Sequence, residues 1–334
     1  MGTTKKRKTT RNNPIYTLKI MQRETYIDIA KGIAITLMVI GHAQLPVVVH
    51  NFIYSFHMPL FFFCSGYFFR LKPIEQTSSI IKSLIKKLLK PYLITSIAMA
   101  ILLSLWYKEL LPSSRTIGFL FPNGSRHDIL FLPNIPDWGF IWFLPSLFWC
   151  RIAYLYIARL KYPFLLSILV STASYILGRY VCNLPFGILS GLCGVVFYSA
   201  GSYFRQIQIS RLQYICLILC WIGCIFFSQV EMIYFTYKCW PIDICGALGG
   251  ILCILKLSQY IDKSPGWEKC KKALLWAGTN SLIILCYHCI SVYAVEVFKV
   301  YIFTFGNKNL AIALNICFVI VFVFLHKKFK AIYN

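Results

Sequence analysis

Apolar runs long enough to cross a membrane occupy most of this chain. A helix needs about 20 apolar residues to span a hydrocarbon core about 30 Å thick. Ten runs of suitable length, separated by short polar or proline-containing breaks, occur at 27–49, 51–69, 91–107, 138–157, 162–178, 184–204, 212–230, 240–257, 273–297 and 309–326. They are apolar on every side, as at 312–325, whereas the strands of a membrane barrel alternate apolar and polar residues. The sequence therefore predicts an all-α, polytopic membrane helix bundle of about ten transmembrane helices.

Composition and charge agree with a membrane domain. Only 13% of the residues are charged, whereas a soluble domain has about 25%. Lys and Arg number 34 against 11 acidic residues. If the amino terminus is cytoplasmic, 25 basic residues fall in cytoplasmic segments and 7 in outer ones, so both termini are expected in the cytoplasm. The basic excess thus indicates the lipid bilayer as a partner, and no nucleic acid.

The polar segments divide the chain into two parts. Residues 1–22 are expected to form a basic cytoplasmic tail, which lacks the apolar core of a signal peptide. Residues 23–330 are expected to form a single transmembrane domain. Its longest polar connection, 108–137, carries four prolines and is expected on the outer side as a lid or binding loop.

Three ionisable side chains lie on the first apolar run, where charge is costly and usually functional. Lys31 follows Asp28 by three residues, which places both on one helix face where they can form an ion pair. His42 follows Lys31 by eleven residues, so it should lie on the same face about 16 Å nearer the outer side. These three residues on one helix face either have a function or are an interfacial ion pair and a hydrogen-bonded core histidine.

Two further histidines lie within apolar runs. If the first two runs are antiparallel neighbours, His57 lies at a depth similar to that of His42. Imidazole can give or take a proton near neutral pH, although packing inside the bundle is the alternative role. His288 lies in the ninth run between two cysteines, but no second ligand pair has suitable spacing, so no metal site is predicted.

Short motifs occur in order along nearly the whole chain. They are RETYIDIAKGIA at 23–34, GH at 41–42, SFHMPLFFFCSGY at 55–67, PY at 91–92, WFL at 142–144 and NSL at 280–282. In these motifs the chain closely resembles acyltransferase family 3, a family of integral membrane enzymes. Within that family it looks most like the branch related to fucose 4-O-acetylases.

The resemblance implies a multi-pass O-acetyltransferase of the bacterial inner (plasma) membrane. Such an enzyme moves an acyl group, usually acetyl from cytoplasmic acetyl-CoA, to a hydroxyl of a cell-surface or exported carbohydrate. Acetyl-CoA is then the donor substrate, the acceptor is a surface glycan or lipid-linked sugar, and no tightly bound cofactor is expected. The family motif of a basic residue and a histidine eleven positions later falls on Lys31 and His42. Lys31 stands where much of the family has arginine, so the bidentate grip on phosphate or carboxylate is lost.

The resemblance and the chemistry suggest roles for the four residues of the first two runs. We expect His42 to act as general base on the acceptor hydroxyl, or as a transient acyl carrier. His57 is expected to orient the hydroxyl or relay its proton. Lys31, paired with Asp28, is expected to guide the donor.

Other residues have a functional and a structural interpretation side by side. Trp142, Asn280, Ser281 and His288 could bind substrate or serve only in packing. A basic group at the inner face could bind the donor phosphates, although the positive-inside rule also explains why basic residues are there. This group consists of Arg70, Lys72, Lys82, Lys86, Lys87 and Lys90. Asp243 and Glu296 are the acids expected near the outer span ends, and neither is chosen as a histidine partner.

A transporter or flippase of a surface-polysaccharide precursor is the alternative function. Intramembrane Asp, Lys and His also mark ion-coupled carriers. The sequence has no internal repeat and no pair of Gly- or Pro-broken spans at matching positions of two halves, which favours the enzyme.

Overall fold

The computed structural model of the chain describes residues 24–42, 45–107 and 141–290, together with 317, 320, 321 and 323. This part is almost entirely helical and contains no β-strand; Glu231 and Thr236 form an isolated β-bridge. The predicted all-α class is therefore confirmed. The basic tail, the 108–137 loop and most of the tenth apolar run lie outside the described residues.

The first two apolar runs break at a different place from the one predicted. Helix α1 (Thr25–Gly41) ends before His42, and α2 (Val47–Tyr54) begins directly after Pro46. The predicted boundary at residue 50 is wrong, because α2 and α3 (His57–Tyr67) together make one candidate span. Proline lacks a backbone donor and disfavours helix in the residue before it, so the chain turns before α2. Hydropathy misses this break because the residues around Pro46 are themselves apolar.

The remaining helices follow the predicted runs more closely. Helix α4 (Thr77–Leu84) follows a short turn, η1 (Ile74–Gln76), and continues through a π-helical turn, η2 (Ile85–Leu89), into α5 (Lys90–Tyr107). The later elements are α7 (Phe143–Ile157), α8 (Pro163–Tyr180), η4 (Pro185–Gly187), α9 (Ile188–Cys193), α10 (Val195–Tyr203), α11 (Arg211–Phe227), α12 (Trp240–Lys263), α13 (Glu268–Thr279) and the helix Ser281–Ile290.

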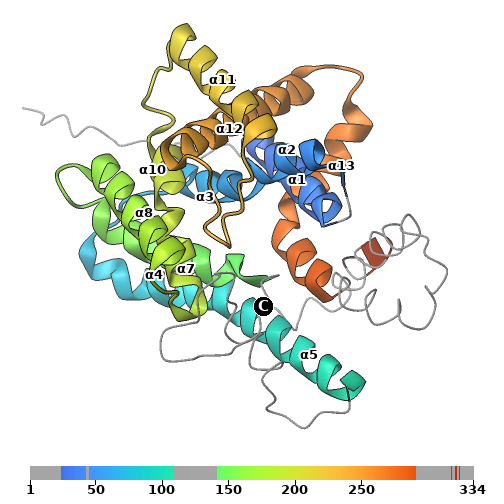
Figure 1. Cartoon of the computed structure of the whole chain (residues 1–334). Helices are drawn as coiled ribbons and strands as arrows, with labels where there is room; N and C mark the ends of the chain where they lie inside the picture. Colours follow the sequence, from blue (N-terminus) through green and yellow to red (C-terminus); the bar gives the residue numbers. More distant parts are fainter. Residues whose placement is uncertain are drawn as a thin grey trace, which may run out of the picture.

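Helix α3 lies between two groups of helices (Figure 1). On one side α1 packs on α12 and α13, and α11 packs on α12. On the other side α10 packs on α3, α7 and α8, with α9 between α7 and α8. Because α3 contacts α1, α10 and α12, residues of the first two runs lie at the centre of the molecule.

Small residues allow α1 and α13 to approach closely, as is common between membrane helices. A Cβ atom added to Gly278 would lie 2.8 Å from the carbonyl carbon of Asp28. A Cβ atom added to Gly32 would lie 2.8 Å from the carbonyl carbon of Leu274. The two glycines therefore set the distance between the helix that carries Asp28 and Lys31 and the one that precedes Ser281.

Two helices of the described part are long and apolar enough to cross a membrane, or up to four if each bent pair counts as one span. The bent pairs are η4–α9 with α10, at 47°, and α13 with Ser281–Ile290, at 73°. The protein is thus a helical membrane protein. The ten-span count, the cytoplasmic placement of both termini and the limits of the single domain stay predictions.

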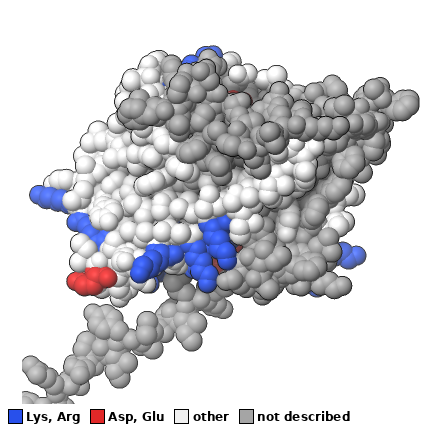
Figure 2. Space-filling model, turned by 90° about the horizontal axis from the view of Figure 1, so that it is seen from below, with Lys and Arg blue, Asp and Glu red and all other residues white. Residues whose placement is uncertain are grey.

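On one face of the molecule the charged side chains lie toward the margin (Figure 2). Figure 2 shows one face on which the broad middle is uncharged and the Lys and Arg side chains lie mainly toward the lower edge. An uncharged belt with charges at its border is the surface expected of a protein in a bilayer, because charged side chains are costly within the hydrocarbon core.

Candidate functional site

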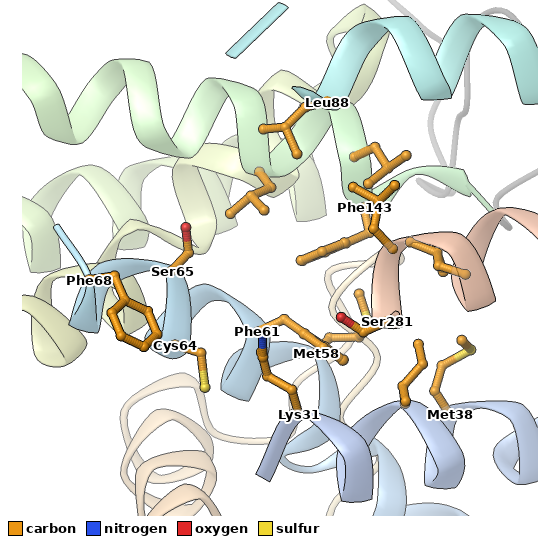
Figure 3. A pocket seen from close by; sticks show the side chains of 15 residues that line it. Lys31, Met38, Met58, Phe61, Cys64, Ser65, Phe68, Leu88, Phe143 and Ser281 are labelled. Atoms are coloured by element: carbon orange, nitrogen blue, oxygen red, sulfur yellow. The ribbon is translucent and has the colours of Figure 1, made fainter. Parts of the chain in front are cut away.

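A cavity of about 210 Å³ lies beside the middle of α1, and we call it the Lys31 cavity. Its wall is mostly apolar and comes from α1, α3, η2, α7 and the helix after α13. The lining residues are Lys31, Ile35, Met38, Met58, Phe61, Cys64, Ser65, Phe68, Leu88, Phe143, Leu144, Leu147, Ser281, Leu282 and Leu285. Figure 3 shows the amino group of Lys31 reaching into this space from α1, with the Ser281 hydroxyl also in the cavity wall.

The ion pair expected from the three-residue spacing is present. Lys31 Nζ lies 2.8 Å from Asp28 Oδ1, and the side chains are 24% and 9% exposed. Asp28 is the more buried partner because Gly278 of α13 packs directly against its backbone. Asp28 does not line the cavity, so within this pair it is Lys31 that presents charge to the cavity.

A second cavity, of about 240 Å³, adjoins the first, and we call it the histidine cavity. It is lined by Met38, His42, Tyr54, His57, Met58, Trp142, Phe143, Glu231, Met232, Ile233, Tyr234 and Leu285. Four of these residues, Met38, Met58, Phe143 and Leu285, also line the Lys31 cavity, and we call them the neck. Lys31 and His42 therefore face two adjoining spaces along one side of α1, which agrees with the single stripe predicted from their spacing.

The turn between α2 and α3 fixes His57 at the inner wall of the histidine cavity. Ser55 donates to the carbonyl of Phe52 at 2.8 Å, and Trp221 Nε1 of α11 donates to the Ser55 hydroxyl at 2.9 Å. His57 is the first residue of α3, and its Nδ1 lies 2.8 Å from the carbonyl oxygen of Ile53. A carbonyl can only accept, so Nδ1 carries the hydrogen and the neutral ring has its lone pair on Nε2. This ring is therefore held in one tautomer.

His42 occupies the end of α1 and is exposed, in contrast to the buried His57. Its ring centroid lies 5.0 Å from that of His288 and 6.4 Å from that of Tyr54. Tyr54 in turn lies 4.9 Å from the ring of His57. The structure thus brings together three histidines that are up to 246 positions apart in the sequence, with Tyr54 between His42 and His57.

The other predicted residues separate into cavity wall and framework. Trp142 lines the histidine cavity and Ser281 the Lys31 cavity. Asn280 lines neither: it ends α13, and its side-chain amide donates to the carbonyl of Trp276 at 2.7 Å. Asn280 therefore stabilises the 73° bend that turns Ser281 into the cavity wall.

Sequence reasoning missed an acidic residue of the histidine cavity. Glu231 lies in the connection between α11 and α12, where the turn from 231 to 236 folds over the cavity. Its carboxylate lies 4.0 Å from His50 Nε2, and the His50 ring stacks on Tyr54 at 3.8 Å. Asp243 is instead a framework residue that accepts from the backbone N–H of Cys239 at 3.0 Å. Glu231 is one of only 11 acidic residues and lies in a connection that the sequence predicts on the outer side, and this is the signal that could have found it.

Metal ligation finds no support in this region. In the described ranges, no group of three or more His, Cys, Asp or Glu side chains lies close enough together to hold a metal ion. The cavities instead offer imidazole, one ammonium and one carboxylate in an apolar surround. Such groups suit proton transfer and the binding of a polar substrate.

Comparison with protein families identifies the chain over nearly its full length. The model of the family described as an acyltransferase domain matches residues 24–325. Comparison with curated proteins and with solved structures gives no match. The matched range contains the Lys31 cavity, the neck and the histidine cavity. The chain therefore belongs to acyltransferase family 3.

Proposed function

We propose that the protein is a membrane O-acetyltransferase. It moves an acetyl group from cytoplasmic acetyl-CoA to a hydroxyl of a cell-surface or exported carbohydrate. The observation that carries this proposal is the pair of adjoining cavities: one presents the Lys31 ammonium, the other presents His42 and His57, and both share the neck. A two-substrate transfer needs two approaches to one reacting centre, and this arrangement supplies them.

The donor enters from the Lys31 side. Lys31 is less than two turns from the start of α1, and the positive-inside asymmetry predicts that this end faces the cytoplasm. The mostly apolar wall of the Lys31 cavity accommodates the uncharged arm of the donor, and Lys31 attracts its polar amides or a phosphate. Asp28 keeps the ammonium in place, so its role is to position Lys31. The thioester then lies at the neck.

His42 acts as the general base. The acceptor hydroxyl gives its proton to the imidazole while its oxygen attacks the thioester carbon. The C–S bond breaks, the thiolate of CoA leaves, and the proton passes from imidazolium to sulfur, which yields an acetyl ester and free CoA. His42 is better suited than His57 because it is exposed at the cavity, whereas His57 is buried and hydrogen-bonded to Ile53. His57 orients the acceptor through its Nε2 lone pair, and His288 packs beside His42.

Acceptor recognition takes place in the histidine cavity. Tyr54, Trp142 and Tyr234 offer aromatic faces on which a sugar ring can stack, and Glu231 offers acceptor oxygens for hydroxyl groups. A carboxylate also disfavours anionic acceptors in its neighbourhood. The proposed acceptor is therefore a neutral sugar unit of a surface glycan or lipid-linked precursor, and the proposed location is the bacterial inner membrane.

A carrier is the second candidate because two helix pairs are broken. Discontinuous helices occur at the substrate sites of many transporters, and the sequence had indicated none. The bends at Gly194 and Asn280 weaken the argument against a carrier that rested on the absence of broken spans. The family match still favours the enzyme, since a carrier needs no acyl donor.

The deciding experiment follows acetyl transfer in cells and with purified protein. Surface polysaccharide is assayed for O-acetyl ester with the wild-type gene, without the gene, and with His42→Ala at equal membrane abundance. Loss of a general base lowers the rate by about 10²–10⁴-fold, so ester should vanish in both altered strains. Purified wild-type protein should also release CoA from acetyl-CoA.

Two results would contradict the proposal. A stably inserted His42→Ala protein with normal acetylation would remove the catalytic assignment. Unchanged acetylation together with a lipid-linked precursor that accumulates in the cell without the gene would establish the carrier instead.

A further inference from the structure

The connection between α11 and α12 contains a tight turn, residues 231–236, that we call the cavity hairpin. The N–H of Glu231 donates to the carbonyl of Thr236 at 3.0 Å, and the N–H of Thr236 donates to the carbonyl of Glu231 at 3.1 Å. The N–H of Tyr234 also donates to the carbonyl of Glu231, at 3.2 Å. These bonds within the loop fix its shape, whereas its position in the molecule depends on what it packs against.

The cavity hairpin forms part of the wall of the histidine cavity. Glu231 lines this cavity, and so do three of the four residues enclosed by the hairpin, namely Met232, Ile233 and Tyr234. Met232 is buried, and Ile233 and Tyr234 are half-buried. Apart from the carboxylate of Glu231, the hairpin therefore presents two apolar side chains and one aromatic ring to the space that contains His42.

The fourth enclosed residue, Phe235, packs elsewhere. It does not line the histidine cavity, and it is fully buried in a small separate core with Leu189 and Cys193 of α9. Its ring lies against α8 at Gly178, where an added Cβ would be 2.6 Å from Phe235 Cε2. The hairpin thus joins α11 to α12 but is anchored on α8 and α9, which belong to the other group of helices.

The backbone of Phe235 shows that this anchor is demanding. Its φ is +50°, in the left-handed region that L side chains rarely adopt, and such a conformation persists only where the surrounding structure holds it. A second contact supports the same link. Trp240, at the start of α12, stacks on Tyr175 of α8 at 4.5 Å, and its Nε1 donates to Thr172 Oγ1 at 3.1 Å. Helix α8 therefore holds both the hairpin and the helix that follows it.

The proposed reaction needs a wall that discriminates against water. A general base can take a proton from water as well as from a sugar hydroxyl, so the base does not choose between them. If water reacted, its oxygen would bond to the thioester carbon, the C–S bond would break, and the proton would pass through the base to sulfur, which yields acetic acid and CoA. The choice must therefore come from the cavity, because exclusion of water from a closed site prevents such side reactions.

We infer that the cavity hairpin directs the acetyl group to the sugar hydroxyl instead of water, and that Phe235 is the residue that positions this hairpin. The inference rests on the proposed function. The apolar side chains of Met232 and Ile233 give a water molecule no hydrogen-bond partner, whereas a sugar ring can pack its C–H groups against them and against the ring of Tyr234. The acceptor is therefore a ring that fills the space along the hairpin and displaces water from it.

The test measures the ratio of free acetate to carbohydrate ester formed from radiolabelled acetyl-CoA in inverted membrane vesicles of the source cell. Vesicles without the gene give the background. Gly178→Ala sets a methyl group against the Phe235 ring and should raise the ratio several-fold. Phe235→Gly keeps the left-handed backbone without strain but removes the anchor, so it should raise the ratio too. Gly223→Ala is the matched control, since its Cβ meets no atom within 4 Å, and its ratio should equal that of wild type.

Two further readouts separate positioning from damage to the fold. A partly unfolded protein makes less of both products, so its ratio does not change. Adding Phe235→Leu to Gly178→Ala shortens the side chain that meets the new methyl group and should bring the ratio part of the way back. Hydrogen exchange of the hairpin amides in purified protein should be faster in Gly178→Ala and Phe235→Gly than in Gly223→Ala, and this readout needs no catalysis.

The outcomes distinguish this inference from the proposed function. An active enzyme whose ratio is the same in Gly178→Ala, Phe235→Gly and Gly223→Ala would overturn the inference and leave the proposed function intact. Unchanged amide exchange in the first two variants would show that Phe235 does not position the hairpin. Wild-type vesicles that form neither product above background would contradict the proposed function itself, and the inference would fall with it.

Discussion

The contact between α1 and α13 gives a prediction whose magnitude follows from the structure. In Gly278→Ala the new Cβ would lie 2.8 Å from the carbonyl carbon of Asp28 and 2.9 Å from the backbone nitrogen of Gly32. Carbon atoms pack at about 3.5 Å or more, and the carbonyl oxygen of Asp28 lies closer to the added Cβ than its carbonyl carbon does, so the helices must separate by more than about 0.7 Å. Overpacking of this kind costs about 1–3 kcal/mol. The same shift moves Asp28 and Lys31 away from Ser281 across the Lys31 cavity.

Gly223→Ala is the matched control, because a Cβ at Gly223 of α11 meets no atom within 4 Å. Both changes gain the helix propensity of alanine, so the difference between the two variants isolates the overpacking. With an unfolding entropy of about 2.1 cal/mol/K per residue, the unfolding temperature of a chain of 334 residues shifts by about 1.4 °C per kcal/mol, so Gly278→Ala should unfold about 1–4 °C below Gly223→Ala in the same detergent. Its acetyl-transfer rate should also fall. If both variants unfold at one temperature and transfer at one rate, the close approach of the two helices is not what positions Lys31.

Three further predictions concern the neck, the acceptor and the connection after α3 that carries Lys72. Met58→Ala widens the neck, so the ratio of kcat/KM for hexanoyl-CoA to kcat/KM for acetyl-CoA should rise. Met99→Ala is the control: Met99 is buried outside both cavities, and its loss should leave this ratio unchanged. Glu231→Gln should raise the KM for the carbohydrate several-fold without changing the KM for acetyl-CoA; a change confined to the donor would contradict its place in the histidine cavity. Arg159 donates to the carbonyl of Lys72, which belongs to the basic group expected to meet the donor phosphates. Arg159→Gln removes this hydrogen bond and should therefore raise the KM for acetyl-CoA, although Arg159 itself lines no described cavity. An unchanged KM would mean that the connection is held in place without Arg159.

Spacing along one helix was enough to predict part of the site. The spacing of three positions from Asp28 to Lys31 predicted an ion pair, and the pair is present at 2.8 Å. The spacing of eleven positions from Lys31 to His42 predicted a shared face, and the two side chains line adjoining cavities. These predictions succeed because helical geometry relates sequence distance to direction without reference to any other element. The roles of these residues in catalysis stay predictions.

Helix breaks and the parts of the site that come from several elements were not predictable in the same way. The boundary between the first two spans was misplaced because the turn at Pro46 lies among apolar residues. The bend after α13 was missed because Asn280 looks like an interhelical hydrogen-bonding residue, whereas its amide bonds within its own helix. Glu231 was overlooked because only the folding of its connection over the cavity brings it near His50.

The sequence by itself determined that this is a helical membrane protein of acyltransferase family 3, and which residues of α1 share a face. Hydropathy, charge asymmetry and helical periodicity are local properties, so they can be read without knowing the neighbours of any helix. Only the tertiary structure decided that Glu231 and His288 join His42, and that Arg151 joins Arg70 and Lys87 around a cavity without acids. Those groupings depend on how α3 packs between the two groups of helices, and packing is settled by shape complementarity over the whole chain, which no single segment contains.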